Sequence, residues 1–242
     1  MHSAFASGYC DWPTLQNRIG EWPLYHYAVH FWPHHVIYSG DTLDEKTWLL
    51  LQQFFKTRDS GIGDSYAAWV VALTPSINLK DMLDTQPLYF AASFGIESLI
   101  RKILHTDPNL DIEAPGGRYG SSPLQVASFR NRTAAVKLLL EANANPMSQN
   151  RAGQSCLFWA VLTKHTEISN LLQSHGATLT QEDKKRLSRM QANTKQSGKV
   201  SIQHQRGGPD TSFPTFTPRS WKLKAVIKRR AKLRGLHSET EG

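Results

Sequence analysis

Cysteine is scarce in this sequence, and long apolar runs are missing from it. Its 242 residues include only two cysteines, Cys10 and Cys156, so no disulfide framework can form. This favours a reducing, intracellular setting. The longest apolar run, residues 67–73, is far shorter than the roughly 20 residues that cross a bilayer, and residues 1–7 lack the features of a signal peptide. We expect no membrane span and a cytoplasmic location, with the nucleus as an alternative.

Signatures of catalysis are also missing. Residues 116–122 superficially resemble a phosphate-binding loop, but the Gly-Lys-Ser/Thr ending is absent and no strand is expected before it. A turn is the better interpretation. The sequence has no G-x-S-x-G nucleophile elbow. Four histidines are candidate metal ligands, but we interpret them as a packed or half-exposed cluster: His26, His30, His34 and His35. We predict a non-catalytic protein without cofactor or metal.

Positive charge is concentrated near the C-terminus. Residues 1–179 hold 13 Lys/Arg and 15 Asp/Glu, whereas residues 180–242 hold 15 and 5. Residues 219–234 contain eight basic residues and no acid. Four of them are candidates for nuclear localisation or nucleic-acid binding: Lys228, Arg229, Arg230 and Lys232. A basic amphipathic helix that touches a membrane or a partner, and a solvated tail without a specific role, stay open as alternatives.

A repeat with a spacing of 33 to 36 residues is the main positive feature. Each unit opens with a three-residue motif that ends in leucine, and an alanine follows three residues after that leucine. The motifs and their alanines are Gln86-Pro87-Leu88 with Ala91, Ser122-Pro123-Leu124 with Ala127, and Ser155-Cys156-Leu157 with Ala160. A pair of aliphatic residues lies at a nearly fixed distance behind: Ile103-Leu104, Leu138-Leu139 and Leu171-Leu172. This pattern predicts a solenoid with two short helices per unit, in which each unit buries its apolar face on its neighbours.

The openings Ser-Pro-Leu-Gln-x-Ala and Gln-Pro-Leu-Tyr-x-Ala resemble the T-P-L-H-x-A signature of ankyrin repeats, over residues 85–177. The resemblance implies an all-α ankyrin-repeat solenoid of about three repeats. We expect four regions: a helical N-terminal cap at 1–78, the repeats at 79–178, a candidate capping helix at 179–190, and a disordered basic tail with a candidate short helix at 191–242.

Three further stretches are similar to fungal NACHT-type proteins that carry ankyrin arrays. Residues 116–120 match their G-G-x-Y-G finger, and residues 24–35 resemble the L-x-x-Y-A-x-x-x-W-x-x-H helix behind the NACHT module. Residues 66–71 resemble the short S-W-L helix before the array. Pro33 departs from this pattern, because we expect proline to kink or end a helix. The resemblance implies that the chain is the sensor piece of a NACHT-type signalling protein.

The spacing also predicts details inside each unit. The turn between the two helices falls at Gly95, Asn131 and Lys164. Glycine and asparagine tolerate a left-handed backbone there, and lysine is a poorer choice. Cys156 stands where the other units have proline. We interpret it as a small buried hydrophobic residue and not as a reactive thiol.

The ankyrin resemblance implies a binding surface made of finger tips and the exposed side of the first helices, on the concave face. When the contact positions of ankyrin repeats are transferred to the matching positions of this sequence, the surface comprises Ser93, Phe94, Arg118, Tyr119, Phe129, Arg130, Arg151, Gln154, Leu162 and Thr163. Several of these residue types are enriched in binding hot spots, although Phe94 and Phe129 are also suited to packing between units.

We therefore predict a monomeric chain that recognises another protein, as a scaffold or sensor. The alternative is a nuclear or nucleic-acid-associated regulator that acts through residues 219–234. A third hypothesis is a regulatory subunit that positions an enzyme on its substrate.

Overall fold

The computed structural model describes residues 17, 21, 25–38, 42–56, 65–73, 81 and 84–197. The chain divides into two units, Met1–Ser212 and Phe213–Gly242, and all described residues lie in the first. Its described elements are helices, with two isolated β-bridges, which confirms the all-α prediction for this part of the chain. The four basic candidates Lys228, Arg229, Arg230 and Lys232 lie outside the described residues.

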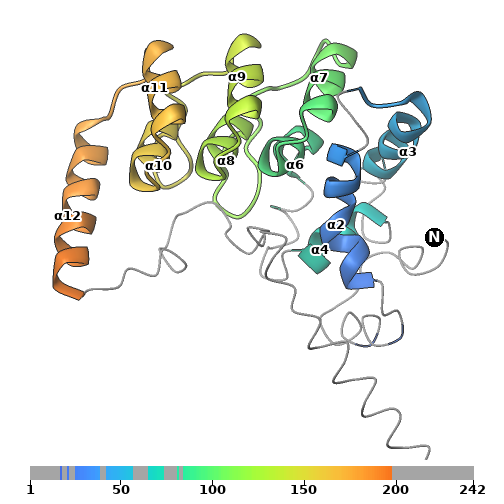
Figure 1. Cartoon of the computed structure of the whole chain (residues 1–242), viewed down its shortest axis with the longest axis horizontal. Helices are drawn as coiled ribbons and strands as arrows, with labels where there is room; N and C mark the ends of the chain where they lie inside the picture. The colour runs from blue at the N-terminus through green and yellow to red at the C-terminus, as the bar shows by residue number, and fades with distance from the viewer. Residues whose placement is uncertain are drawn as a thin grey trace, which may run out of the picture. The chain divides into compact units, whose positions relative to one another are not determined.

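Three helix pairs form the repeats. They are α6 (Pro87–Phe94) with α7 (Glu97–Thr106), α8 (Pro123–Phe129) with α9 (Thr133–Glu141), and α10 (Cys156–Leu162) with α11 (Thr166–Ser174). The first helices stack in the order α6, α8, α10, and the second helices stack in the order α7, α9, α11 (Figure 1). The predicted solenoid of two-helix units is confirmed.

The repeated leucine and alanine are buried in all three units. Leu88, Leu124 and Leu157 are at most 1% exposed. Ala91, Ala127 and Ala160 are fully buried, at sites where stacked helices leave room for only a methyl group. A fully buried aliphatic side chain contributes about 1.5–3 kcal/mol. Because neighbouring units provide much of this burial, the repeats stabilise one another.

The turn after each first helix has a left-handed residue at the predicted place. The φ angles are 74° at Gly95, 58° at Asn131 and 61° at Lys164. In the first unit, the Gly95 and Ile96 amides both donate to the Ala91 carbonyl, which closes the helix end. The strain of a left-handed backbone is therefore largest at Lys164, because its long side chain cannot form the local hydrogen bond that a short asparagine side chain forms in this conformation.

Lys164→Gly is expected to stabilise the chain by about 0.5–1 kcal/mol. The strain energy that glycine relieves at this left-handed position is larger than the free-energy cost of its greater conformational entropy in the unfolded chain. Urea unfolding followed by circular dichroism measures this change. Lys164→Ala is the matched control, since it removes the charge but keeps Cβ and should give no gain. Equal stabilisation by both variants would contradict the backbone explanation.

An aromatic cluster joins three N-terminal helices to the first repeat. They are α2 (Tyr25–Tyr38), α3 (Glu45–Lys56) and α4 (Ser65–Leu73). Trp69 of α4 is 1% exposed, and its ring centroid lies 5.6 Å from that of Trp32 and 4.8 Å from that of Phe90 in α6. The Trp69 indole N–H donates to the Val29 carbonyl at 2.9 Å. Trp69 thus links α2 to the array.

Two expectations about helix ends need correction. Pro33 does not end α2, which continues to Tyr38. Pro33 and Val36 are both buried, so packing offsets the hydrogen bond that proline removes. At the other end of the array, α12 (Gln181–Ser197) runs beyond residue 190, into the segment expected to lack regular structure. This helix packs against α10, so it extends the row of first helices.

Candidate protein-binding surface

Two β-bridged turns form the fingers. Gly116 pairs with Ser121, and Gln149 pairs with Ser155. The first finger lies tightly on Tyr89 of α6, because a Cβ at Gly116 would be only 2.6 Å from the tyrosine ring. Its neighbour Gly117 has a φ of 63°, which also favours glycine. The sequence Gly-Gly-Arg-Tyr-Gly is therefore a structural turn, as predicted.

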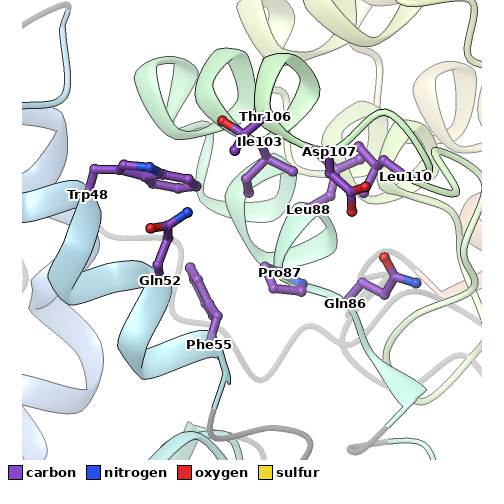
Figure 2. Close-up of a pocket in the computed structure, with 10 residues that line it drawn as sticks. All are labelled: Trp48, Gln52, Phe55, Gln86, Pro87, Leu88, Ile103, Thr106, Asp107 and Leu110. Atoms are coloured by element: carbon purple, nitrogen blue, oxygen red, sulfur yellow. The ribbon is translucent and has the colours of Figure 1, made fainter. Parts of the chain in front are cut away.

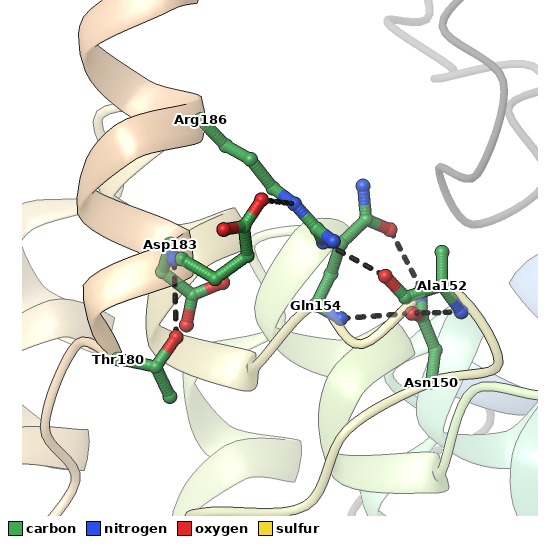
Figure 3. Close-up of polar contacts among 7 residues, drawn as sticks. Asn150, Ala152, Gln154, Thr180, Asp183 and Arg186 are labelled. Atoms are coloured by element: carbon green, nitrogen blue, oxygen red, sulfur yellow. Dashed lines mark hydrogen bonds and ion pairs between the residues drawn. The ribbon is translucent and has the colours of Figure 1, made fainter.

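Hydrogen bonds tie these fingers into one row. The Gly117 amide donates to Thr85 Oγ1 at 2.9 Å, and the Arg151 amide donates to the Tyr119 carbonyl at 3.1 Å. Arg186 of α12 donates through Nη1 to the Ala152 carbonyl at 2.8 Å (Figure 3). The fingers are consequently held in place before any partner binds, which lowers the entropic cost of association.

Arg151 belongs to this framework as well as to the surface. Its Nη1 lies 2.6 Å from Asp81 Oδ1, where the arginine side chain is 54% exposed and the aspartate side chain 7%. A carboxylate this buried requires a partner. Arg151 therefore connects the second finger to the segment before the first repeat, and only part of its guanidinium can face a ligand.

Gln154 is internal to the second finger. It is 5% exposed, and its Oε1 accepts from Asn150 Nδ2 at 2.9 Å. Asn150 Oδ1 in turn accepts from the Ala152 and Gln154 amides (Figure 3). The prediction that Gln154 faces a partner is thus corrected, because the side chain is used to fold its own turn.

A second glutamine connects the two fingers. Gln125 of α8 is fully buried. Its Oε1 accepts from the Ser122 amide at 2.9 Å, and its Nε2 donates to the Gln154 carbonyl at 2.7 Å and the Ser148 carbonyl at 3.2 Å. Ser122 Oγ accepts from the Gln125 amide, which completes a capping box at the start of α8.

Two of the aromatic candidates pack against neighbouring elements. The Phe94 ring lies 6.2 Å from that of Trp32 in α2, and the Phe129 ring lies 5.1 Å from that of Trp159 in α10. Ser93 is 2% exposed, so its predicted contact with a partner is corrected. The first repeat contributes little accessible surface at this point, because α2 contacts its turn.

The remaining candidates are accessible. Arg118 is exposed, and Tyr119, Phe129, Arg130, Leu162 and Thr163 are half-buried. Each ring is paired with a guanidinium: Arg118 lies 5.8 Å from the Tyr119 centroid, and Arg130 lies 5.9 Å from the Phe129 centroid. Leu162 packs on a cluster that contains Trp159 and Leu187. We call Arg118, Tyr119, Phe129, Arg130, Arg151, Leu162 and Thr163 the finger–helix surface.

Sequence reasoning missed two residues that link successive units. Arg132 donates through Nε to the Ser93 carbonyl at 3.2 Å, and His165 Nδ1 lies 3.0 Å from the Ser128 carbonyl oxygen. Both reach the carbonyl end of the preceding first helix, where the positive charge of Arg132 is favourable. The signal in the sequence is the position that the two residues share, because Arg132 directly follows the left-handed Asn131 and His165 directly follows the left-handed Lys164.

Burial makes the thiol of Cys156 inert. The residue is fully buried, and this burial raises the pKa of the Cys156 thiol to about 12. Since the thiolate is the nucleophile, a Cys10→Ser variant should show no reaction with Ellman's reagent in native buffer near neutral pH, and full reaction in denaturant. Rapid labelling of the native protein would contradict the buried-core interpretation.

His34 and His35 of α2 lie beside other polar side chains. The Tyr27 hydroxyl and His35 Nε2 are 2.9 Å apart. Burial, and then the charge of Arg132, lower the pKa of His34. Among the described residues, no group of three or more His, Cys, Asp or Glu side chains could hold a metal ion. None of the described helices combines the length and apolarity needed to cross a membrane.

A pocket of 260 Å³ lies between α3 and the first repeat. Trp48, Gln52 and Phe55 face the first repeat across it (Figure 2). Its other lining residues are Gln86, Pro87, Leu88, Ile103, Thr106, Asp107 and Leu110. The α3 helix is thus separated from the array here, whereas Trp69 of α4 contacts it directly.

Comparison with known proteins agrees with this geometry. Residues 76–183 match the family model for ankyrin repeats (3 copies), so this region is an ankyrin-repeat array. The chain is 34% identical over 113 residues to an ankyrin repeat-containing protein of Treponema pallidum (strain Nichols), covering 47% of this chain and 37% of that protein. Ankyrin repeats are a generally non-catalytic family of protein-interaction modules.

A fungal protein is also similar. The chain is 27% identical over 143 residues to the azaphilone pigments biosynthesis cluster protein L of Monascus ruber, covering 53% of this chain and 29% of that protein. The chain thus spans about a third of the length of these two curated relatives.

Proposed function

We propose that this chain is a non-catalytic recognition module that binds a partner protein through the finger–helix surface. The observation that carries this proposal is the bonded row of fingers, in which Gly117, Arg151 and Arg186 fix the backbone through Thr85, Tyr119 and Ala152. A rigid row that presents arginine and aromatic side chains combines preorganisation with hot-spot residue types.

The test is a quantitative pull-down that compares the wild-type chain with Arg118→Ala/Tyr119→Ala/Arg130→Ala. We expect the variant to lose at least about 90% of the specifically recovered partner, since truncation at a hot spot costs about 2 kcal/mol or more. The matched control is Arg101→Ala/His105→Ala, which changes two exposed residues of α7. If the triple variant recovers the same partners in the same amounts, the proposed surface is wrong.

The wider setting is part of the same proposal. The motifs shared with fungal NACHT-type proteins favour a role as the sensor piece of such a signalling protein, acting as a monomer in the cytoplasm. The link would be contradicted if the partner had no connection to a nucleotide-dependent signalling assembly.

The basic segment supports a second candidate function. Residues 219–234 hold eight Lys/Arg and no acid, which is suited to phosphate contacts. We propose a nuclear or nucleic-acid-associated role for it as the alternative. A reporter fused to residues 178–242 should then enter the nucleus and bind DNA in a salt-dependent manner. Nuclear exclusion together with salt-insensitive binding would remove this alternative.

A further inference from the structure

Charge is segregated between the two sides of the array. The fingers, first helices and following turns, together with the start of α12 (residues 86–96, 115–132, 149–165 and 180–190), hold nine Lys/Arg and two Asp/Glu. The second helices and the loops behind them (residues 97–114, 133–148 and 166–179) hold three Lys/Arg and six Asp/Glu. The balance is therefore +7 on the side of the fingers and −3 on the side of the second helices.

The two acids on the finger side are already engaged. Asp183 is fully buried and accepts from Ser155 Oγ at 2.8 Å. Glu182 Oε1 lies 3.4 Å from Arg186 Nε. Two of the three cations on the opposite side are also paired, since Lys102 meets Glu45 and Lys137 meets Glu167, each at 3.5 Å. The pairs of Arg186 with Glu182 and of Lys137 with Glu167 each lie within one side, so they leave the net charge of that side unchanged.

Positive charge on the finger side remains accessible at both ends of the first helices. Arg118 is exposed at the first finger, near the start of α8. Arg130 is half-buried at the end of α8, and Lys164 is exposed just after α10. The half-buried side chains of Phe129 and Leu162 are the last residues of α8 and α10, next to Arg130 and close to Lys164. The surface therefore combines apolar side chains and cations at the ends of two first helices with a further cation at the first finger.

From this arrangement we infer that the partner presents an acidic peptide segment with apolar side chains to the finger–helix surface. This inference rests on the proposed protein-binding function and specifies its chemistry. Carboxylates of the partner would meet Arg118, Arg130 and Lys164, and its apolar side chains would pack on Phe129 and Leu162. Charge complementarity of this kind speeds association and excludes basic partners.

The same geometry argues against nucleic acid as the ligand of this surface. Sequence-independent binding of single strands uses aromatic rings as stacking platforms. Here the guanidinium groups of Arg118 and Arg130 lie over the half-buried Tyr119 and Phe129 rings, which leaves less than a full ring face for a base, whereas an aliphatic side chain needs only a part of the ring. Charge alone does not separate the two ligands: Arg151 and Arg186 are bonded to Asp81 and Ala152, and the other seven of the nine cations on this side fall within the roughly 6–10 phosphate contacts of strongly salt-dependent binders.

A display library of random twelve-residue peptides tests the inference with the full-length chain. We expect enriched peptides to contain at least about twice the input content of Asp and Glu, and to bind less tightly at high salt. Enrichment of neutral or basic peptides would overturn the acidic-partner inference and leave the protein-binding function standing. Failure to enrich any peptide would contradict the protein-binding function itself.

Charge-reversal variants locate the contact. We expect the variant Arg118→Glu and the double variant Arg130→Glu/Lys164→Glu each to bind a labelled acidic peptide about tenfold more weakly, because attraction becomes repulsion at each site. Arg101→Glu makes the same change on an exposed residue of α7 and should leave affinity unchanged. Equal losses for Arg118→Glu and Arg101→Glu would overturn the inference.

The basic segment at residues 219–234 needs its own control, because its positive charge also attracts acidic peptides. Lys228→Gln/Arg229→Gln/Arg230→Gln/Lys232→Gln should keep most of the peptide affinity. If this variant loses all binding, the tail is the acceptor and the inference is wrong. A labelled single-stranded oligonucleotide forms the last arm: if it displaces the peptide and its affinity falls in Arg118→Glu, nucleic acid is the better ligand.

Discussion

Replacing Trp69 by alanine should lower the free energy of unfolding by about 3–5 kcal/mol, the usual cost of truncating a buried aromatic side chain. The indole is 1% exposed, and its ring meets those of Trp32, Phe54 and Phe90 within 4.8 to 5.6 Å. The substitution also leaves the Val29 carbonyl without the donor that now lies 2.9 Å away. The lost contacts are those that hold α2 and α4 on the first repeat.

Urea unfolding monitored by circular dichroism provides this measurement. Tyr38→Ala is the control, because Tyr38 is an aromatic residue of α2 that is 81% exposed, and surface changes of this kind stay within about 0.5 kcal/mol. If Trp69→Ala also costs less than about 1 kcal/mol, the N-terminal helices do not stabilise the array and their role as a cap is wrong.

Gln125→Leu should cost about 3–5 kcal/mol, although leucine is apolar and similar in size. The substitution leaves the Ser122 amide and the Gln154 and Ser148 carbonyls without the side chain that now bonds to all three. Each buried polar group that loses its partner costs about 1–3 kcal/mol. The effect should be structural as well as energetic, because the second finger is held to α8 by this side chain.

Two measurements separate these consequences. Urea unfolding gives the change in stability, and amide hydrogen exchange reports the opening of residues 149–155, where protection should fall. Gln149→Leu is a matched control, since Gln149 lies in the same finger but is exposed. A stable Gln125→Leu protein with unchanged exchange would show that the bonds of Gln125 do not maintain the finger.

Local patterns explain why much of the fold could be predicted from the sequence. The spacing of Leu88, Leu124 and Leu157 specifies which helix face is buried, and burial of all three follows from the period alone. The left-handed turns at Gly95, Asn131 and Lys164 follow in the same way, because a short connection between antiparallel helices requires a reversal of the backbone at a fixed place.

Contacts between distant segments could not be predicted in this way. The pairing of Asp81 with Arg151 joins residues 70 positions apart, and no spacing rule indicates it. Carrying over surface positions by repeat register also misplaced Ser93 and Gln154, which are buried. The two cases differ: α2 packs on Phe94, next to Ser93, whereas Asn150 of the same finger folds the backbone around Gln154.

The central claim is that the finger–helix surface binds a protein, and one titration tests it most directly. The affinity of the recovered partner, or of an enriched acidic peptide, is measured by isothermal titration calorimetry for the wild type and for Arg118→Ala/Tyr119→Ala/Arg130→Ala. Both proteins are first shown to unfold at the same urea concentration. We predict a Kd at least about tenfold higher for the variant. An unchanged Kd in an equally stable variant would contradict the claim.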